Sequence, residues 1–426
     1  MAEHEHGAAR RDRAGAAPGP GLDPRRRQHG RLPPRLHRHE LLPRPRHRPV
    51  HRPRHQRDPQ RHRPHPHRAA ARTHPQDDHH DLTGGPAVGE LLADHTTLRL
   101  GGPARRWFTH SDPAAWPDLA RAVRREPGRA FVLGGGSNTL ADDSGYGGTV
   151  IHMATRGITC RHTGPGAVEV TVQAGERLAD LVAFTVAEQL SGIEYLSGIP
   201  GTVGAAPVQN TGAYGQEIAD ALARITAYDW RTGRALALPS TACGFGYRTS
   251  AFKAQPGRLT ILSLTLRLVR SALAAPVGYA YLADHLAVPL CTRPPLAEAA
   301  AAVLDHRAAR GLLLPETGDD ARQAGSVFLN PPVTPAQANA VRAAGGPLHH
   351  DRDNVPRVSA GWLLEHVGHY PGQELQPGIR TSRRRTLTLT AHPGATSVGF
   401  AAALMGMAER VDEATGIRLH LEPIRI

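Results

Sequence analysis

Lysine is almost absent from this sequence. Lys253 is the one lysine among 51 basic residues, so arginine carries nearly all of the positive charge. The charge is unevenly spread, because residues 1–80 hold 19 arginines and eight acidic residues and therefore +11 of the net +13. The rest of the chain carries only +2, which does not indicate an anionic macromolecular partner for the folded part.

Cysteine and aromatic residues are also scarce, and long apolar runs are missing. Cys160, Cys243 and Cys291 are an odd number without C-x-x-C spacing, which excludes a disulfide framework or a cysteine zinc site and favours a reducing cytoplasm. No run of about 18 apolar residues occurs, so we expect no membrane insertion. Aromatic residues form 4% of the chain, whereas a nucleic-acid interface interleaves aromatic and basic residues, so we expect no specific nucleic-acid binding.

Residues 1–80 are of low complexity. The stretch RPRHRPVHRPRHQRDPQRHRPHPHR is arginine, histidine and proline with almost no apolar residues, so it predicts a disordered tail. Three interpretations stay open: a basic arm for nucleic acid or an anionic membrane, a histidine-rich metal-binding tract, or a tail without a folded role that reflects a start assigned too far upstream. The near-exclusive use of arginine favours the last.

From about residue 81, strand-like and helix-like segments alternate. Residues 96–110 predict two strands around a glycine turn, residues 223–239 predict a hairpin across 231–233, and residues 258–269 predict a long strand. Helices are expected at 112–126 and 178–190 and, in a second unit, at 296–310, near 334–344 and at 358–367, with strands at 385–390 and 417–426. This mixture of β-α-β units and hairpins indicates an α+β fold, and we expect domains at 81–271 and 272–426.

Two glycine-rich stretches are candidate ligand loops. VLGGGSN, residues 132–138, runs from a predicted strand into three glycines, which allow backbone N–H groups to approach an anion closely. It matches neither G-x-G-x-x-G nor the lysine-containing phosphate loop, and a glycine turn without a ligand is an equal alternative. Residues 196–215, LSGIPGTVGAAPVQNTGAYG, are too irregular for a helix or strand and too apolar for a solvent loop. A large polar cofactor would satisfy such a backbone, although a pair of ordinary turns is also open.

Three further motifs contain isolated polar residues. Arg248 lies among aromatic and small residues in FGYRTSAFK, which indicates either a carboxylate or phosphate ligand or a structural ion pair. Ser326 lies in QAGSVFLN, which has no histidine or acidic residue and is therefore not an obvious catalytic triad. Glu422 interrupts the alternation of GIRLHLEPIRI and by itself would be interpreted as an exposed carboxylate at a sheet edge.

Taken in this order, these five motifs, with SAGWLLEHVG at 359–368, resemble the UDP-N-acetylenolpyruvoylglucosamine reductase family over about residues 88–426. The resemblance implies an FAD-binding unit of two subdomains, of the vanillyl-alcohol-oxidase kind, followed by a smaller α+β substrate-binding domain. It also implies a cytoplasmic enzyme that works as a monomer. Such an enzyme takes a UDP-sugar substrate, holds FAD non-covalently and uses NADPH as the hydride donor.

The resemblance also assigns roles to residues. Ser326 would protonate the carbanion or enolate left at C2 of the substrate, while Arg248 and Glu422 would polarise its carboxylate, with Glu422 protonated when it acts. The cofactor would contact residues of the two glycine-rich loops, namely Gly134, Gly135, Gly136, Ser137, Asn138, Pro200, Gly201, Thr202, Gly204, Ala205, Val208 and Gly212. The sugar nucleotide would contact Tyr247, Tyr279, Arg310 and Asn330, with Tyr281 competing with Tyr279 for the gating role.

Two segments depart from the family pattern. The family's R-x-x-K is RAAR here, so Arg310 stands where the family has lysine. The family's S-x-K-H with a following asparagine is replaced in TSRRRTLTLTAH, residues 381–392, by a sequence that has neither that histidine nor that asparagine. Both departures concern the substrate side and leave Arg248, Ser326 and Glu422 in place.

Overall fold

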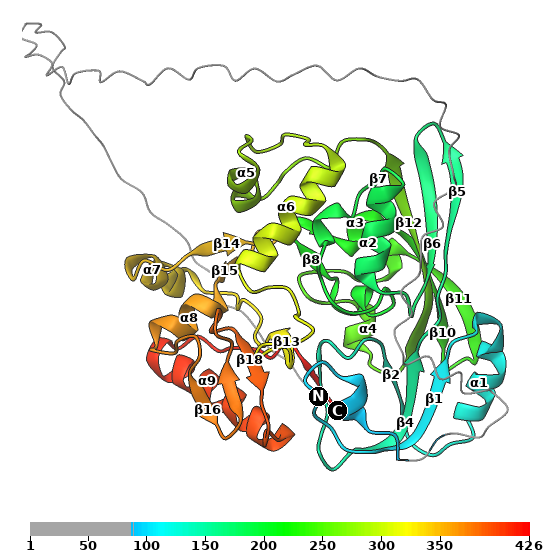
Figure 1. Cartoon of the computed structure of the whole chain (residues 1–426), viewed down its shortest axis with the longest axis horizontal. Helices are drawn as coiled ribbons and strands as arrows, with labels where there is room; N and C mark the ends of the chain where they lie inside the picture. The colour runs from blue at the N-terminus through cyan, green and yellow to red at the C-terminus, as the bar shows by residue number, and fades with distance from the viewer. Residues whose placement is uncertain (1–86, 88) are drawn as a thin grey trace, which may run out of the picture. The chain divides into compact units, whose positions relative to one another are not determined.

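The computed structural model describes residue 87 and residues 89–426, so the predictions for residues 1–80 lie outside the described part (Figure 1). The described part contains a small parallel sheet, a larger antiparallel sheet and a third sheet near the C-terminus. This combination confirms the α+β prediction.

The first sheet is built from β-α-β connections. Its order is β1-β4-β2 with parallel pairing, and its strands are β1 (Ala104–His110), β2 (Ala130–Leu133) and β4 (Tyr146–Met153). Helix α1 (Trp116–Val123) connects β1 to β2 and buries Trp116, Leu119 and Val123, the side chains that recur at helical spacing in the sequence. The glycine loop 134–138 follows β2 directly, as predicted.

The second sheet forms the main core of residues 89–271, which are named the cofactor-binding part after their predicted role. Its order is β11-β10-β12-β6-β5, with β7 also pairing with β12, and its strands are β5 (Ile158–Gly164), β6 (Ala167–Gln173), β7 (Leu190–Ser191), β10 (Leu222–Asp229), β11 (Arg234–Pro239) and β12 (Leu259–Arg270). In the pairing of β6 with β12, valines lie opposite leucines, and all of these side chains are fully buried: Val168, Val170, Val172, Leu264, Leu266 and Leu268. Each such side chain contributes about 1.5–3 kcal/mol relative to exposure. Helix α2 (Leu178–Ala187) packs Leu178 and Leu181 into the same core.

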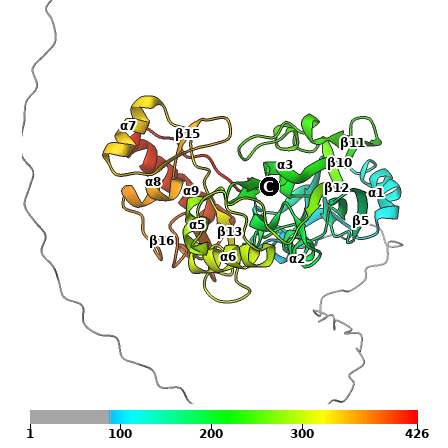
Figure 2. The same ribbon diagram turned by 90° about the horizontal axis from the view of Figure 1, so that it is seen from above.

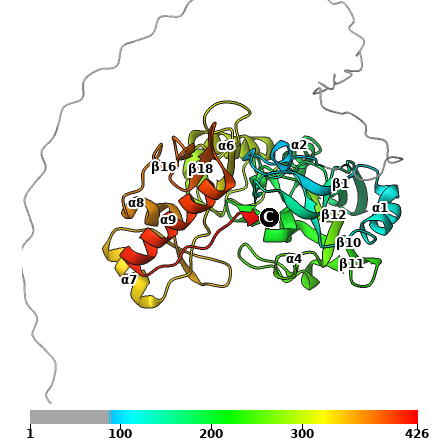
Figure 3. The ribbon, with the colours of Figure 1, turned by 90° about the horizontal axis from the view of Figure 1, so that it is seen from below.

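The third sheet belongs to the C-terminal part. Its antiparallel order is β13-β18-β17-β16, with strands β13 (Gln323–Ser326), β16 (Glu374–Gln376), β17 (Ile379–Thr381) and β18 (Thr388–Ala391). Three helices, α7 (Pro335–Ala343), α8 (Ala360–His366) and α9 (Ser397–Thr415), and the hairpin of β14 (Leu348–His350) with β15 (Pro356–Val358) complete this part. Figure 3 shows α7, α8 and α9 gathered around β16 and β18.

Residues 272–312 connect the two parts and contain α5 (Ala280–Leu286) and α6 (Leu296–Ala309). Their apolar side chains, including Val277, Leu282 and Val303, form a core with Tyr195 and Tyr214 of the cofactor-binding part. The domain boundary near residue 272 stays a prediction.

The end of the chain returns to the cofactor-binding part. The amide of Glu422 donates to the carbonyl of Val327, and β19 (Ile424–Arg425) then pairs in parallel with β3 (Thr139–Leu140). Figure 2 shows the C-terminus between the two groups of elements. The strand predicted over 417–426 is therefore wrong for most of its length, because the segment changes partners and is regular only at its last residues.

Two other predictions need correction. Residues 96–100 form no strand. Leu98 and Leu100 are instead buried in the core of the C-terminal part. Helix α9 was not predicted, although its start shows a cap: Thr396 accepts a hydrogen bond from the amide of Gly399 over 3.0 Å. The hairpin of β10 with β11, the long β12, and helices α2, α6, α7 and α8 confirm the corresponding predictions.

Candidate active site

The two glycine-rich loops lie against each other. A side-chain carbon on Gly134 would collide with the hydroxyl of Thr202, and one on Gly135 would lie 3.3 Å from Cα of Gly201. Gly136 has φ of +60° and its missing side chain would collide with the carbonyl of His95. The glycines are therefore required by the close approach of backbones and by one left-handed conformation.

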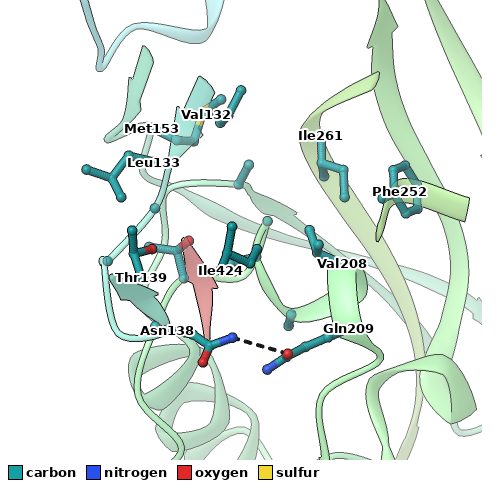
Figure 4. Close-up of a pocket in the computed structure, with 18 of the residues that line it drawn as sticks. Val132, Leu133, Asn138, Thr139, Met153, Val208, Gln209, Phe252, Ile261 and Ile424 are labelled. Atoms are coloured by element: carbon teal, nitrogen blue, oxygen red, sulfur yellow. Dashed lines mark hydrogen bonds between the residues drawn. The ribbon is translucent and has the colours of Figure 1, made fainter. Parts of the chain in front are cut away.

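These loops line a cavity of about 310 Å³ (Figure 4). Of the residues predicted to bind the cofactor, the following line it: Gly134, Gly135, Gly136, Ser137, Asn138, Pro200, Gly201, Thr202, Gly204, Ala205 and Val208. Its remaining walls are largely apolar and include Met153, Phe252, Ile261 and Ile424. A glycine backbone at one end and apolar walls at the other suit a cofactor with a diphosphate and a flat ring, since backbone N–H groups bind phosphate and apolar surface holds the ring.

A second cavity of about 400 Å³ adjoins the first and contains the predicted catalytic residues. The two cavities share Ser137, Asn138, Pro200, Gln209 and Thr211. The second is lined by Arg248, Ser326 and Glu422 and by Tyr279, Arg310 and Gly212. Gly212 thus lies at the second cavity rather than the first. Residues from three distant parts of the chain therefore meet beside the cofactor cavity.

Arg248 and Glu422 form an ion pair, with 3.4 Å between Nε and Oε1. Arg248 has φ of +51°, an unusual conformation for a side-chain-bearing residue. Its guanidinium also donates to the carbonyls of Asn210, at 3.3 Å, and Gly212, at 2.9 Å. The second glycine-rich stretch, which contains both carbonyls, therefore orients the guanidinium of Arg248. The carboxylate of the ion pair comes from the end of the chain.

Glu422 is enclosed rather than exposed at a sheet edge. Its side chain is 15% exposed, and burial raises the pKa of Glu422 above its ordinary value even though Arg248, Lys253 and Arg385 act in the opposite direction. The interpretation of the C-terminal segment alone, an exposed edge carboxylate, is therefore wrong. A carboxyl with a raised pKa keeps its proton to a higher pH than an exposed carboxyl does.

Ser326 ends β13 opposite Thr388 of β18. The backbone carbonyl of its neighbour Val327 accepts from the amide of Glu422 over 3.0 Å, which brings serine and carboxylate to the same cavity. The hydroxyl of Ser326 accepts a hydrogen bond from Nη2 of Arg385 over 3.3 Å. Arg385 belongs to TSRRR, a segment that differs from the family pattern. The sequence showed this difference but not the contact of Arg385 with Ser326.

The far side of the second cavity is aromatic and basic. Tyr279 precedes α5 and contacts the ring of Tyr214 edge-on, with 5.6 Å between centroids, and Tyr214 hydrogen-bonds His306. Arg310 follows α6, and Arg307 and Tyr281 also line the cavity. Both tyrosines that compete for the gating role therefore face it, and the choice between them stays open.

Tyr247 and Asn330 do not line either cavity. The guanidinium of Arg357 lies 4.1 Å from the centre of the Tyr247 ring and donates to the carbonyl of Asn330 over 3.1 Å. The Asn330 side chain accepts from the amide of Ala360 over 2.9 Å at the start of α8. These contacts support the wall behind the catalytic residues, and the predicted contact of Tyr247 and Asn330 with substrate stays a prediction.

Lys253 was not among the predicted site residues. It lines the first cavity, and its amine donates to the backbone carbonyl of Arg248 over 3.0 Å. Burial lowers the pKa of Lys253, Glu422 raises it, and Arg248 lowers it further. Its position as the chain's one lysine, within FGYRTSAFK, was the available signal.

In the described residues, no helix combines the length and the apolar character that crossing a membrane requires. Comparison with known proteins gives two matches to protein families. Residues 110–238 match the family described as FAD binding domain, and residues 317–426 match UDP-N-acetylenolpyruvoylglucosamine reductase, C-terminal domain.

Whole proteins with the reductase name are also similar to this chain. UDP-N-acetylenolpyruvoylglucosamine reductase of Salinispora arenicola is 40% identical over 345 residues, 79% of this chain and 94% of that protein. The same-named protein of Thermobifida fusca is 38% identical over 344 residues, 79% of this chain and 96% of that protein. The crystal structure of the reductase from Thermus caldophilus, 25% identical, superposes with a TM-score of 0.54 over 80% of this chain and 99% of that one.

Proposed function

This chain belongs to the UDP-N-acetylenolpyruvoylglucosamine reductase family, and from that premise we propose that it reduces UDP-N-acetylglucosamine enolpyruvate to UDP-N-acetylmuramate in peptidoglycan precursor synthesis. The observation that carries the proposal is the meeting of Arg248, Ser326 and Glu422 at one cavity beside the glycine-walled one.

The first cavity is the proposed FAD site. Loop 134–138 is proposed to offer backbone N–H groups to the diphosphate. In loop 200–205 the amides of Val203, Gly204 and Ala205 already donate to carbonyls of the protein. When bound, FAD supplies the hydride for the substrate, and NADPH is the proposed source of that hydride. Asn138 and Gln209, hydrogen-bonded to each other over 3.2 Å (Figure 4), line both cavities and mark the passage from one to the other.

Arg248 and Glu422 are proposed to act on the carboxylate of the enolpyruvyl group. Arg248 is positioned by two backbone carbonyls, so its guanidinium can pair with an incoming carboxylate without reorganisation. Negative charge develops on that carboxylate as C2 becomes a carbanion, and Arg248 stabilises it. Glu422, with its raised pKa, is proposed to be protonated at this stage and to donate a hydrogen bond to the same oxygen atoms.

Ser326 is proposed to protonate C2. A serine hydroxyl is a weak acid, but a carbanion is a strong base, and a fixed geometry makes the transfer feasible. The backbone of β13 holds Ser326, and the contact of Val327 with Glu422 keeps the hydroxyl at the cavity that Arg248 lines.

The sugar nucleotide is proposed to extend along the aromatic and basic wall. Arg310, which replaces the family's lysine, and the adjacent Arg307 offer charge for the diphosphate, while Tyr279 covers it. Tyr247 and Asn330 are also proposed to contact the sugar nucleotide. A cytoplasmic monomer is the proposed working form; the three free cysteines, Cys160, Cys243 and Cys291, support a reducing compartment.

The test is NADPH oxidation by the purified FAD-loaded chain, with and without UDP-N-acetylglucosamine enolpyruvate, for the wild type and Ser326→Ala. We expect substrate-dependent turnover that falls about 10²–10⁴-fold in the variant, while reduction of the flavin by NADPH stays within twofold. Ser144→Ala, an exposed serine outside both cavities, is the control. A rate of NADPH oxidation that does not change when the sugar nucleotide is added would instead indicate an FAD-linked oxidase or dehydrogenase with another substrate.

A further inference from the structure

The guanidinium of Arg385 is fixed against the side chain of Ser326. Nη2 of Arg385 donates to Ser326 Oγ over 3.3 Å, and Nη1 donates to Thr388 Oγ1 over 3.2 Å. Thr388 is also the residue opposite Ser326 in the pairing of β13 with β18. The strand that positions the serine therefore also positions the arginine.

Within the described residues, the guanidinium of Arg385 contacts hydroxyl groups rather than a carboxylate. Among the ion pairs of the described residues, within 4.0 Å, none includes Arg385, although Arg383 pairs with Asp319. Burial lowers the pKa of Arg385 to about 10, Arg307 and Arg310 add to this, and Glu422 and Tyr214 act in the opposite direction. With such a pKa the guanidinium is charged at neutral pH. A cation that lacks a close anion is thus in hydrogen-bond contact with the serine hydroxyl.

We infer that Arg385 is a positioning residue for the proton transfer, which orients Ser326 and stabilises the alkoxide that the serine becomes. The inference rests on the proposed function. In the step, the O–H bond of Ser326 breaks and the electron pair of the C2 carbanion forms the new C–H bond. The alkoxide is left beside the guanidinium until it takes a proton from water. A charge-assisted hydrogen bond from Arg385 is stronger to the alkoxide than to the neutral hydroxyl. Arg385 therefore lowers the barrier to proton transfer from Ser326 to C2.

The position of Arg385 is one at which this sequence departs from the family pattern. The segment TSRRR has arginine where the resemblance indicates a histidine, and it is this arginine that reaches Ser326. The other basic side chains of the cavity have different contacts. Arg248 pairs with Glu422, and Arg307 donates to the carbonyl of Leu312 over 2.8 Å. Among the side-chain hydrogen bonds of residues 87 and 89–426, that of Arg385 is the one made to Ser326 Oγ.

The test measures the two half-reactions of the FAD-loaded full chain by rapid mixing. Arg385→Met should slow the oxidation of the reduced enzyme by UDP-N-acetylglucosamine enolpyruvate about 50–500-fold, whereas reduction by NADPH should stay within twofold. Arg385→Lys should be about tenfold faster than Arg385→Met, since lysine restores the positive charge but not the forked geometry of the guanidinium. The solvent deuterium isotope effect on substrate reduction should rise in Arg385→Met, because proton transfer becomes slower. Arg383→Met, whose arginine is exposed, is the matched control and should behave as the wild type.

A double-mutant cycle separates this role from a structural one. In the Ser326→Ala background, Arg385→Met should have less than a threefold further effect, because the arginine acts through the serine. Equal losses in both backgrounds, or a single variant within twofold of the wild type, would overturn the inference. If Arg385→Met does not retain FAD, Arg385→Lys and its isotope effect carry the same test. A wild type that does not respond to the sugar nucleotide would overturn the proposed function itself, which the other outcomes leave intact.

Discussion

The side-chain amide of Asn138 donates a hydrogen bond to the backbone carbonyl of Glu422, with 3.1 Å between nitrogen and oxygen. One residue after Asn138 and two residues after Glu422, the parallel pairing of β3 with β19 begins, with Thr139 opposite Ile424. The glycine loop of the cofactor cavity and the carboxyl group of the second cavity are thereby held by one short set of hydrogen bonds. Displacement of either loop should affect both the cofactor and the chemistry.

The first prediction concerns the protonation of Glu422 during turnover. If its protonated form acts, substrate-dependent kcat of the wild type falls as the pH rises through its pKa, which lies above the ordinary value of 4.5. Glu422→Gln should be about 10²-fold slower and should lack this pH dependence, since an amide does not titrate. Pre-steady-state flavin reduction by NADPH serves as the control. A flat profile for the wild type would contradict the role of the protonated carboxyl.

The same pKa predicts a pH-dependent stability difference. A carboxyl whose folded-state pKa is raised binds its proton more tightly when folded, so the folded state loses stability as the pH rises through that pKa. Glu422→Gln does not undergo this loss. We therefore expect Tm of the variant relative to the wild type to increase between pH 4.5 and pH 8, by roughly 2–4 °C for each kcal/mol. Thermal unfolding measures both Tm values. A Tm difference that is constant across this pH range would show that burial does not outweigh the neighbouring cations in setting the pKa of Glu422.

The second loop contact predicts how Gly134 affects cofactor binding. In Gly134→Ala the added methyl group meets the hydroxyl of Thr202, so the Thr202 side chain or the two loops must shift. We expect the dissociation constant for FAD to rise about 10–100-fold, which corresponds to roughly 1.4–2.8 kcal/mol. Gly147→Ala is the matched control, because nothing lies within 4 Å of its added carbon. Fluorescence titration with FAD measures the dissociation constants of both variants. Equal affinities would argue against binding of FAD between the two glycine-rich loops.

Lys253 can be probed by chemical labelling because it is the chain's one lysine. The lowered pKa of its amine predicts that the labelling rate has its midpoint below the ordinary 10.5, as more of the amine is neutral at a given pH. FAD should slow the labelling, since Lys253 lines the first cavity. Mass spectrometry of the peptide that contains residue 253 separates it from the N-terminal amine. Labelling that FAD does not affect would place the cofactor elsewhere.

The open choice between Tyr279 and Tyr281 predicts unequal effects of substitution. Tyr279 contacts Tyr214 and is 41% exposed, whereas Tyr281 is 59% exposed, so Tyr279 is the better-anchored cover of the second cavity. Tyr279→Ala should raise KM for the sugar nucleotide about tenfold, and Tyr281→Ala should change it less than twofold. Steady-state kinetics of the two variants decides the assignment, and the reverse order would transfer the role to Tyr281.

Local patterns predicted the elements whose partners are near in sequence. The hairpin of β10 with β11 was predicted because its strands are joined by a short turn. Helices α6, α7 and α8 were predicted because apolar spacing is a local pattern, and α7 and α8 also begin at a local side-chain cap. The segment 96–100 was predicted wrongly as a strand for the opposite reason. Leu98 and Leu100 have the apolar pattern of a strand, but their partners are side chains of the C-terminal core.

For the site, the sequence by itself determined the candidate residues: the glycines of two loops, an isolated arginine, an isolated serine and a carboxylate near the end. Tertiary structure alone decided that Glu422 is enclosed, that it pairs with Arg248, and that Arg385 reaches Ser326. These contacts join residues from distant parts of the chain, and so does the backbone pairing of β19 with β3. Burial and charge pairing depend on which segments pack together in space, and a local pattern of residues does not contain that information.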